Sequence, residues 1–218
     1  GKLAGTPVVA VITSMAQPLG THIGNALEVK DAIDVLAGRT QGDLLEISLL
    51  LGSHMLVLAE KVKTLPEARA MLENALSSGA GLRKLAEMIA AQGGDPRVVE
   101  DLSLLPQAAV KRVMRAEMAG YLSAMDTTAL GMAAQRMGAG RAKKSDMLDY
   151  SVGYVLHVRL GDEVTEDTLL ATLYARNEAE AEEAEKAIRK ALTIAKEKPQ
   201  TPKLWDAVVT AEGITYNR

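Results

Sequence analysis

The sequence predicts a mixed α/β fold, α+β overall, and three observations lead to this prediction. An apolar, β-branched run at Val8–Ile12 predicts a buried strand near the amino terminus. Helical periodicity then dominates from residue 25 to about residue 91. From residue 110, apolar residues alternate instead, which predicts strands. We therefore expect one strand followed by several helices over residues 1–105, and a smaller β-rich region over 106–210.

Each helix of the first region is marked by its own pattern. Apolar residues recur at helical spacing after Asn25, a residue type that caps helices. Thr64 and Glu67 form a capping-box pattern that opens a helix lasting to Leu76, and a helix over 82–91 ends at a Gly-Gly pair. Apolar stripes are expected at Ala26, Val29, Ile33 and Leu36, and at Leu44, Ile47, Leu51, Met55, Leu58 and Val62.

The second region alternates strands with two helices. We expect strands over 110–118, 150–159, 169–174 and, at an edge, 205–210, with residues 211–218 as a loose tail. Helices are expected over 125–137, capped by Asp126, and over 178–194. In the latter, Glu182–Lys186 and Glu185–Arg189 have the i,i+4 spacing of ion pairs. The strand over 150–159 should place Val152, Tyr154, Leu156 and Val158 on one face.

Composition limits the possible functions. The 218 residues are 48% hydrophobic and 24% charged, which is typical of a globular chain. A net charge of −3 argues against nucleic-acid or membrane-surface binding, and no apolar run approaches the length of roughly 18 residues that a membrane span needs. The chain has no Cys, so thiolate chemistry and Cys-ligated zinc are excluded, while the redox compartment stays open.

The segment between the first strand and the first helix suits a ligand. Pro18, Gly20 and Gly24 interrupt the backbone there, at the carboxyl end of the predicted strand. Irregular backbone frees carbonyl oxygens, and such oxygens bind a hard cation when a carboxylate balances the charge. Asp31 lies just beyond the first helical turn, and its side chain should point back toward the start of the helix.

The same residues carry a family resemblance. The run ITSMAQPLGTHIGNALEVKDAIDVL, followed in order by LGSHMLVLA, AAQGGD, LP and GAGRAKKSDMLDYSVGYVLHVRLGDEV, resembles pyrimidine-nucleoside and thymidine phosphorylases. Ser14, Ala16 and Asp31 are mild departures from the usual pattern. The resemblance identifies the chain as the carboxyl-terminal half of such an enzyme. It implies an α/β domain part over 1–105, a barrel-sandwich-like carboxyl-terminal domain over 106–210 and a tail over 211–218.

This resemblance implies a pentosyltransferase reaction, the reversible phosphorolysis of thymidine or uridine to the free base and (deoxy)ribose 1-phosphate. Family members are cytoplasmic homodimers whose partners are a pyrimidine nucleoside and phosphate. Their phosphate site is a Lys-His-Ser and Gly-rich loop, and an Arg, a Ser and a Lys grip the base; none of these motifs occurs here. We therefore expect no catalytic and no substrate-binding residue in this chain, and no phosphorolysis without the amino-terminal half.

What the resemblance does imply here is part of a site for a monovalent cation, usually potassium, whose remaining ligands come from the amino-terminal half. The motif assigns backbone carbonyl ligands to Leu19 and His22 and a carboxylate ligand to Asp31. His22 stands where a smaller residue is common, which backbone ligation tolerates. Asp31 replaces the usual Glu and is shorter by one methylene, so a water bridge is an alternative to direct ligation. Without the resemblance, the sequence would predict that Asp31 is a surface residue of its helix.

The remaining motifs give less support for a functional site. The three histidines lack metal-ligand spacing, so we expect His54 to make a local hydrogen bond and His157 to lie on the polar face of its strand. Gly138–Arg141 with Lys143 and Lys144 fits a helix stop and basic turn better than a phosphate cradle. An alternative function is a non-catalytic carrier or interaction module, because the strands around Gly161-Asp162 resemble half of a lipoyl- or biotinyl-type domain. That turn has no Lys to modify.

Overall fold

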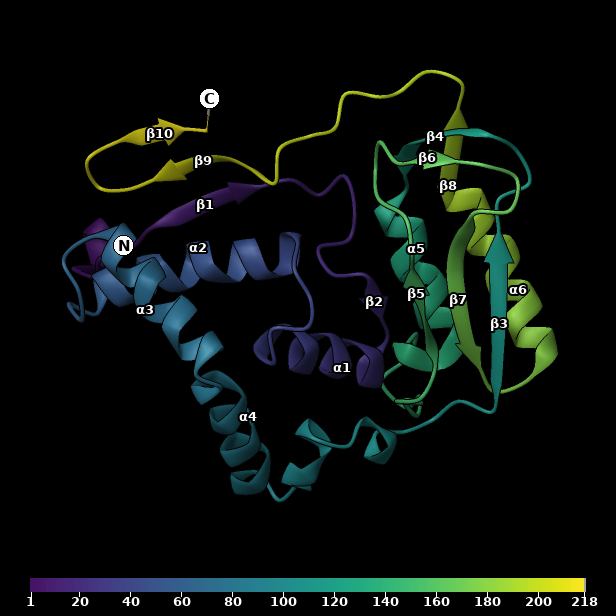
Figure 1. Cartoon of the computed structure of the whole chain (residues 1–218), viewed down its shortest axis with the longest axis horizontal. Helices are drawn as coiled ribbons and strands as arrows, with labels where there is room; N and C mark the ends of the chain where they lie inside the picture. Colours follow the sequence, from purple (N-terminus) through teal and green to yellow (C-terminus); the bar gives the residue numbers. More distant parts are fainter. Residues whose placement is uncertain (218) are drawn as a thin grey trace. The chain divides into compact units, whose positions relative to one another are not determined.

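The computed structural model describes residues 1–217 and has six α-helices and three small antiparallel sheets, which confirms the mixed α+β class (Figure 1). The chain divides into two compact units that interleave along the sequence. Unit 1 comprises residues 1–14, 33–96 and 202 onward, and unit 2 comprises residues 15–32 and 97–201. The domain limits implied by the family resemblance, at 105 and 210, stay a prediction.

Unit 1 holds three of the helices and one sheet. Thr64 caps α3 as expected, because its Oγ1 accepts a hydrogen bond from the Glu67 N–H; the Glu67 carboxylate reaches back to the N–H of Lys63 rather than to that of Thr64. The glycine pair after α4 ends that helix as predicted, with Gly93 at φ +82°. The elements are η1 (Lys2–Ala4), β1 (Ala10–Thr13), α2 (Asp43–Leu58), α3 (Leu65–Ser77), α4 (Ala80–Ala91), β9 (Trp205–Val209) and β10 (Ile214–Tyr216).

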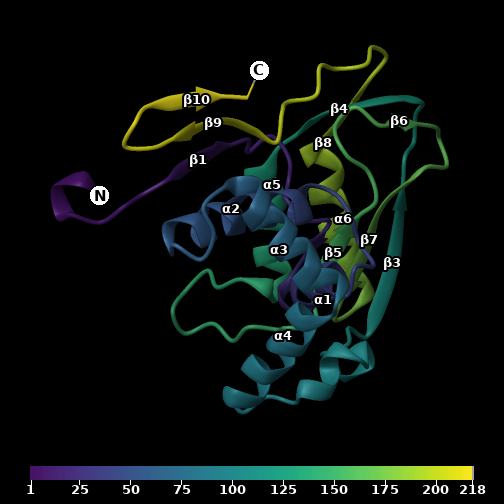
Figure 2. The ribbon, with the colours of Figure 1, turned by 60° about the vertical axis from the view of Figure 1, so that its left-hand side comes forward.

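The sheet of unit 1 corrects three expectations. Its order is β1-β9-β10, so β9 is the central strand and not an edge, and part of the expected loose tail forms β10 (Figure 2). The first strand is not buried: Val8 is 53% exposed and Ile12 49%. Strand β1 is an edge strand that pairs only with β9. Its apolar side chains therefore stay exposed, unlike those of a strand inside a covered sheet.

The buried face of α2 also differs from the predicted stripe. Of the stripe residues only Ile47 is buried, while Leu51, Met55 and Leu58 are exposed. Leu45 and Leu49 are buried instead and pack with Val35. Helix α2 is apolar around most of its circumference, so periodicity alone could not identify the face that packs.

Unit 2 contains two antiparallel sheets and the larger core. The first sheet has the order β2-β5-β7-β3 and the second β6-β4-β8, and the described residues form no barrel. Helix α1 begins in this unit and ends in unit 1. The elements are β2 (His22–Ile23), α1 (Asn25–Leu36), η2 (Pro96–Val99), η3 (Leu102–Leu104), β3 (Val110–Arg115), β4 (Gly120–Met125), α5 (Thr127–Ala134), η4 (Gln135–Ala139), β5 (Gly153–Leu156), β6 (Glu163–Val164), β7 (Leu169–Ala175), α6 (Glu178–Ala191) and β8 (Leu192–Ala195).

Helices α5 and α6 cover one face of the four-stranded sheet, and the core lies between them (Figure 1). The predicted inward face of the 150–159 strand is confirmed: Val152, Tyr154, Leu156 and Val158 are each no more than 3% exposed. The Tyr154 hydroxyl donates to the Leu130 carbonyl of α5 (2.8 Å), and burial raises the pKa of this phenol.

Helices α5 and α6 begin as the sequence predicts, but α6 ends early. Asp126 caps α5 by accepting from the Ala129 N–H (2.9 Å). Helix α6 stops at Ala191, and residues 192–194, predicted helical, belong instead to β8, which runs to Ala195 beside β4. Its end is a strand because Leu192 and Ile194 alternate into the second sheet. None of the helices in the described chain has the length and apolar character needed to cross a membrane.

Candidate cation site

The irregular segment over residues 15–21, which we call the 15–21 loop, is held by backbone and side-chain groups of the β5 strand and the turn that follows it. The Leu156 N–H donates to the Thr21 carbonyl (2.8 Å), and the Leu160 N–H donates to the Gln17 Oε1 atom (3.0 Å). The Arg159 guanidinium donates to the Pro18 carbonyl (2.6 Å). All of these groups belong to unit 2. The loop therefore has a defined conformation although it contains no regular secondary structure.

His22 follows the loop in β2, an edge strand that pairs with β5. His22 is opposite Val155, and the flanking Thr21 carbonyl accepts from β5. In an antiparallel ladder, alternate residues direct their carbonyls toward and away from the partner strand. The His22 carbonyl consequently points away from β5, toward the side of the sheet that carries no further strand. That is the direction in which a carbonyl can take part in ligand binding.

The junction between β2 and α1 depends on two glycines. Gly24 has φ +134°, and a Cβ there would lie 2.4 Å from the Val152 carbonyl oxygen. Gly153 faces it with φ +149°, and a Cβ there would lie 2.1 Å from the Ile23 oxygen. Only glycine permits this close approach. Asn25 does not cap α1 as expected: it is the first helical residue, and its side chain donates to the Ala139 carbonyl (2.8 Å).

Asp31 lies on α1 and is only 3% exposed, so the reading of Asp31 as a surface helix residue is wrong. Its Oδ1 atom is 3.4 Å from the Nδ1 atom of His22, and that nitrogen is 3.0 Å from the Thr21 hydroxyl. The imidazole of His22 therefore faces the carboxylate, a contact that sequence reasoning missed because nothing in the spacing of residues 22 and 31 marks it. A buried carboxylate needs a partner that balances its charge.

The predicted ligand atoms are of the chemical type that binds a monovalent cation. Carbonyl oxygens of Leu19 and His22 and a buried carboxylate are hard oxygen ligands, which alkali ions prefer. Within residues 1–217 there is no group of three or more His, Cys, Asp or Glu side chains that could hold a metal by side chains alone. A cation here would therefore depend mainly on the backbone of the 15–21 loop and of β2. The assignment of Leu19, His22 and Asp31 as its ligands stays a prediction.

The other two histidines lie away from this set of oxygen ligands. His157 is exposed on its strand, as predicted, and its Nε2 atom is 2.8 Å from the Thr172 hydroxyl. Desolvation and the nearby Lys111 ammonium lower the pKa of His157. His54 on α2 departs from expectation: within the described residues its buried Nε2 atom has no hydrogen-bond partner, and burial lowers the pKa of this imidazole.

The basic turn after α5 does not form a phosphate cradle. Its Ala142 and Lys143 N–H groups both donate to the Asp146 carboxylate, at 3.0 and 2.8 Å. Gly138 has φ +106° and closes the helical segment, which confirms the helix-stop reading. Because a carboxylate already occupies the N–H donors, this turn offers no site for an anion.

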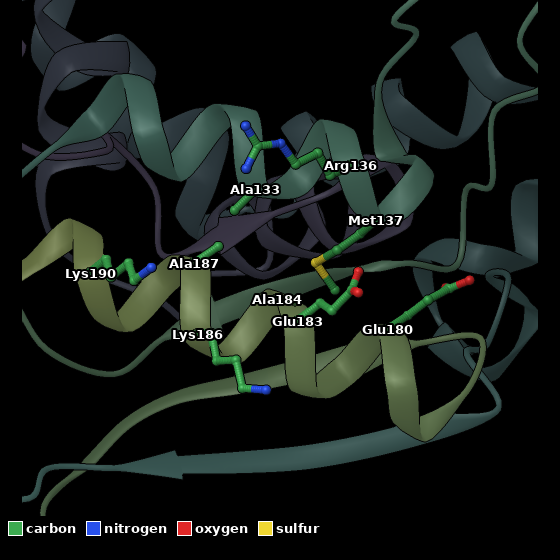
Figure 3. Close-up of a pocket in the computed structure, with 9 residues that line it drawn as sticks. All are labelled: Ala133, Arg136, Met137, Glu180, Glu183, Ala184, Lys186, Ala187 and Lys190. Atoms are coloured by element: carbon green, nitrogen blue, oxygen red, sulfur yellow. The ribbon is translucent and has the colours of Figure 1, made fainter.

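Two of the pockets in unit 2 are lined by several charged side chains. One, of about 430 Å³, adjoins the 15–21 loop and is lined by His22, Lys30, Lys111, His157 and Arg159 among others. Another, of about 340 Å³, separates η4 from α6 (Figure 3). Arg136 lines one side of the second pocket, and the lining residues of α6 include both acids and lysines. Charges of both signs leave it without a preference for either kind of ion.

Comparison with known proteins gives a consistent result. Residues 121–195 match the family profile described as "Pyrimidine nucleoside phosphorylase C-terminal domain". The chain is 47% identical over 178 residues to the pyrimidine-nucleoside phosphorylase of Geobacillus stearothermophilus and 48% identical over 178 residues to that of Bacillus subtilis (strain 168); each alignment covers 82% of this chain and 41% of the relative. It is 42% identical over 195 residues to the Staphylococcus aureus (strain NCTC 8325 / PS 47) protein of that name, covering 89% of this chain and 45% of the relative. The chain thus spans less than half the length of the curated relatives it matches.

Proposed function

We infer, because this chain is homologous to part of the pyrimidine-nucleoside phosphorylases, that it acts as part of an enzyme for the reversible phosphorolysis of pyrimidine nucleosides. The observation that carries this proposal is 47% identity sustained over 178 residues. In that reaction phosphate attacks the anomeric carbon of the sugar while the base departs. The transition state is expected to resemble an oxocarbenium ion, with negative charge growing on the base.

Such a reaction needs cations and N–H groups that position phosphate, and donors that stabilise the departing base. The motifs that do so in the family are absent from this sequence. We therefore propose that the substrate-binding groups come from residues outside the 218, and that this chain provides scaffold. The β-rich region matched at residues 121–195 would be the carboxyl-terminal domain of the enzyme.

We further propose that Leu19, His22 and Asp31 bind potassium. The support is the burial of Asp31 and the outward direction of the His22 carbonyl from its ladder. When bound, the ion would neutralise the carboxylate and fix the loop geometry without entering the chemistry. The residues of this chain would hold that ion and keep the β2–α1 junction in one shape.

A first experiment tests whether this chain needs a separate substrate-binding segment for phosphorolysis. The purified chain is assayed with thymidine and with uridine in the presence of phosphate, and we expect no release of base. The same chain is then mixed with a separately produced segment of the Bacillus subtilis enzyme that covers the part this chain does not match. Base release that needs both pieces supports the proposal. Turnover by this chain alone would contradict it.

A second experiment tests the cation ligands. The melting temperature of unit 2 is followed in potassium chloride and in choline chloride at equal ionic strength. A ligand that binds only the folded state stabilises it, so potassium should raise the melting temperature of the wild type. Asp31→Asn should abolish this difference. Asp34→Asn is the matched control, since Asp34 is a buried acid of the same helix that pairs with Arg39 (2.7 Å). Equal responses in both variants would refute the Asp31 assignment.

A further inference from the structure

Arg159 contacts three successive carbonyls of the 15–21 loop. Its guanidinium nitrogens lie 2.6 Å from the Pro18 oxygen, 3.4 Å from the Leu19 oxygen and 3.5 Å from the Gly20 oxygen. Arg159 lies in the turn just beyond β5, and its neighbour Leu160 donates its N–H to Gln17. The turn after β5 thus contacts the backbone of three consecutive loop residues and the side chain of the residue before them, Gln17.

Three consecutive carbonyls directed at one point are an unfavourable arrangement by themselves. In an extended strand successive carbonyls alternate in direction, and here their negative ends converge. A positive charge at the point of convergence offsets the repulsion between them. Arginine suits this role because its planar guanidinium presents five donors and stays protonated in proteins. Arg159 therefore stabilises a carbonyl cluster that the loop backbone would not adopt alone.

We propose that Arg159 is a positioning residue for the alkali-ion site: it orders the 15–21 loop so that the Leu19 carbonyl is already aimed when the ion arrives. This inference rests on the cation site proposed above. A carbonyl oxygen has two lone pairs, and the contact from Arg159 to Leu19 is the longer 3.4 Å one, so this oxygen keeps capacity for a second partner. The short contact, to Pro18, holds the loop without using the ligand oxygen itself.

A guanidinium near a cation site also repels the cation, so the two effects must be weighed. Arg159 is partly solvent-exposed, which screens its charge, and the Asp31 carboxylate offsets the remaining positive charge. Ordering the backbone of these loop residues at the moment of binding is the larger penalty, because each ordered residue loses conformational entropy. Preorganisation therefore outweighs repulsion, and removing Arg159 should weaken the binding of the ion.

The test compares Arg159→Gln with Arg115→Gln in the whole chain. Arg115 is a matched control because it lies in the same unit and donates to a single backbone carbonyl, that of Asp167 (2.6 Å). Amide hydrogen exchange is measured over residues 15–23 without potassium, and binding of thallium(I), a potassium substitute, is measured by ²⁰⁵Tl NMR. We expect Arg159→Gln to accelerate exchange about tenfold and to weaken thallium binding at least fivefold, and Arg115→Gln to do neither.

A third variant, Arg159→Lys, and the thallium binding of the wild type separate failure of the Arg159 proposal from failure of the cation site. Arg159→Lys keeps the charge but loses the fork of donors, so it should recover less than half of both effects. Unchanged exchange in Arg159→Gln, or thallium binding that tightens, would overturn the proposal. The proposal would also be overturned if the wild type binds thallium and Arg159→Gln accelerates exchange but binds thallium as tightly as the wild type. Failure of the wild type to bind thallium would instead refute a cation site formed by this chain alone, and the exchange measurement would still decide whether Arg159 orders the loop.

Discussion

The two units bury their apolar residues to very different extents. The core of unit 2 joins 23 buried residues from both of its sheets, α5 and α6. Among the described residues, the buried cluster around α2 in unit 1 joins Val35, Leu45 and Leu49, while large apolar side chains of β1 and α2 lie exposed. Both units come from sequence with clear apolar patterning. Patterning therefore tells which side chains are suited to burial, whereas burial itself depends on the presence of a second surface.

The proposed function accounts for this contrast. If the chain is part of a longer enzyme, β1 and α2 carry apolar surface that a further segment of that enzyme would cover. Unit 2, by contrast, contains both the sheets and the helices that cover them. We therefore expect most of the stability of this chain to reside in unit 2.

The largest expected effect comes from removing a core leucine of unit 2. Leu173 on β7 is fully buried, and Leu173→Ala should lower the free energy of unfolding of this unit by about 3 kcal/mol. Hydrogen exchange of the β5 and β7 amides measures that free energy separately from the stability of unit 1. The matched control is Leu51→Ala on α2, where the side chain is 43% exposed. Its cost should stay below about 1 kcal/mol. Equal costs at the two positions would contradict the contrast between the units.

A smaller effect tests the ion pairs that join α6 to the sheet. Glu185 accepts from the Arg112 Nε atom of β3 (2.6 Å) and from Arg189 (2.9 Å). Burial favours a raised pKa for the Glu185 carboxyl, but the hydrogen bonds from the two arginines outweigh it and lower the pKa below its ordinary value. Charged hydrogen bonds of this kind are worth about 1–2 kcal/mol, and Glu185→Gln should lose that amount near pH 7.

The pH dependence of that loss has a definite sign. A carboxyl whose pKa is lower in the folded state stabilises the protein above its unfolded pKa, and this stabilisation disappears as the pH falls through the folded value. The difference between wild type and Glu185→Gln should therefore be constant near neutrality, shrink once the pH falls below the ordinary Glu pKa of about 4.3, and vanish below the lowered pKa of the folded state. Glu182→Gln is the control, because its partner Lys186 is exposed and the pair should contribute little. Urea titrations of both variants at several pH values measure these differences. A Glu185 effect that persists in acid would show that packing, not charge, is responsible.

The accuracy of the sequence predictions depends on whether a feature is set by local spacing or by what packs against it. In unit 2 the inward face of β5, the Asp126 cap and the ion pairs of α6 were predictable, because each depends on local spacing. In unit 1 the helices were predictable, but the buried face of α2 and the exposure of β1 were not, since both depend on what packs against them. The cation residues came from motif resemblance alone. The Arg159 contacts join residues about 140 positions apart in the sequence, and no local sequence pattern predicts such a contact.

The smallest expected effect concerns two of the three histidines, His54 in unit 1 and His157 in unit 2. The buried Nε2 atom of His54 has no partner within residues 1–217, and a buried polar atom of this kind destabilises the fold. His54→Leu should therefore raise the stability of unit 1, by about 0.5–1 kcal/mol at pH 7. Because burial lowers the pKa of His54, the unfolded chain binds more protons below about pH 6.5, and the wild type loses stability there. The gain from the substitution should accordingly grow as the pH falls from 7 to 5.5.

His157→Leu is the counterpart in unit 2 and should behave in the opposite way at neutral pH. The imidazole of His157 is the partner of Thr172, a hydroxyl residue that is only 5% exposed, so leucine would leave a buried polar group unpaired. Thermal unfolding of both variants at pH 7 and pH 5.5 makes the comparison. A gain from both substitutions, or a loss from both, would mean that hydrogen-bond satisfaction does not distinguish the two units. A gain at His54 with a loss at His157 would extend the difference between the units from their apolar packing to their buried polar groups.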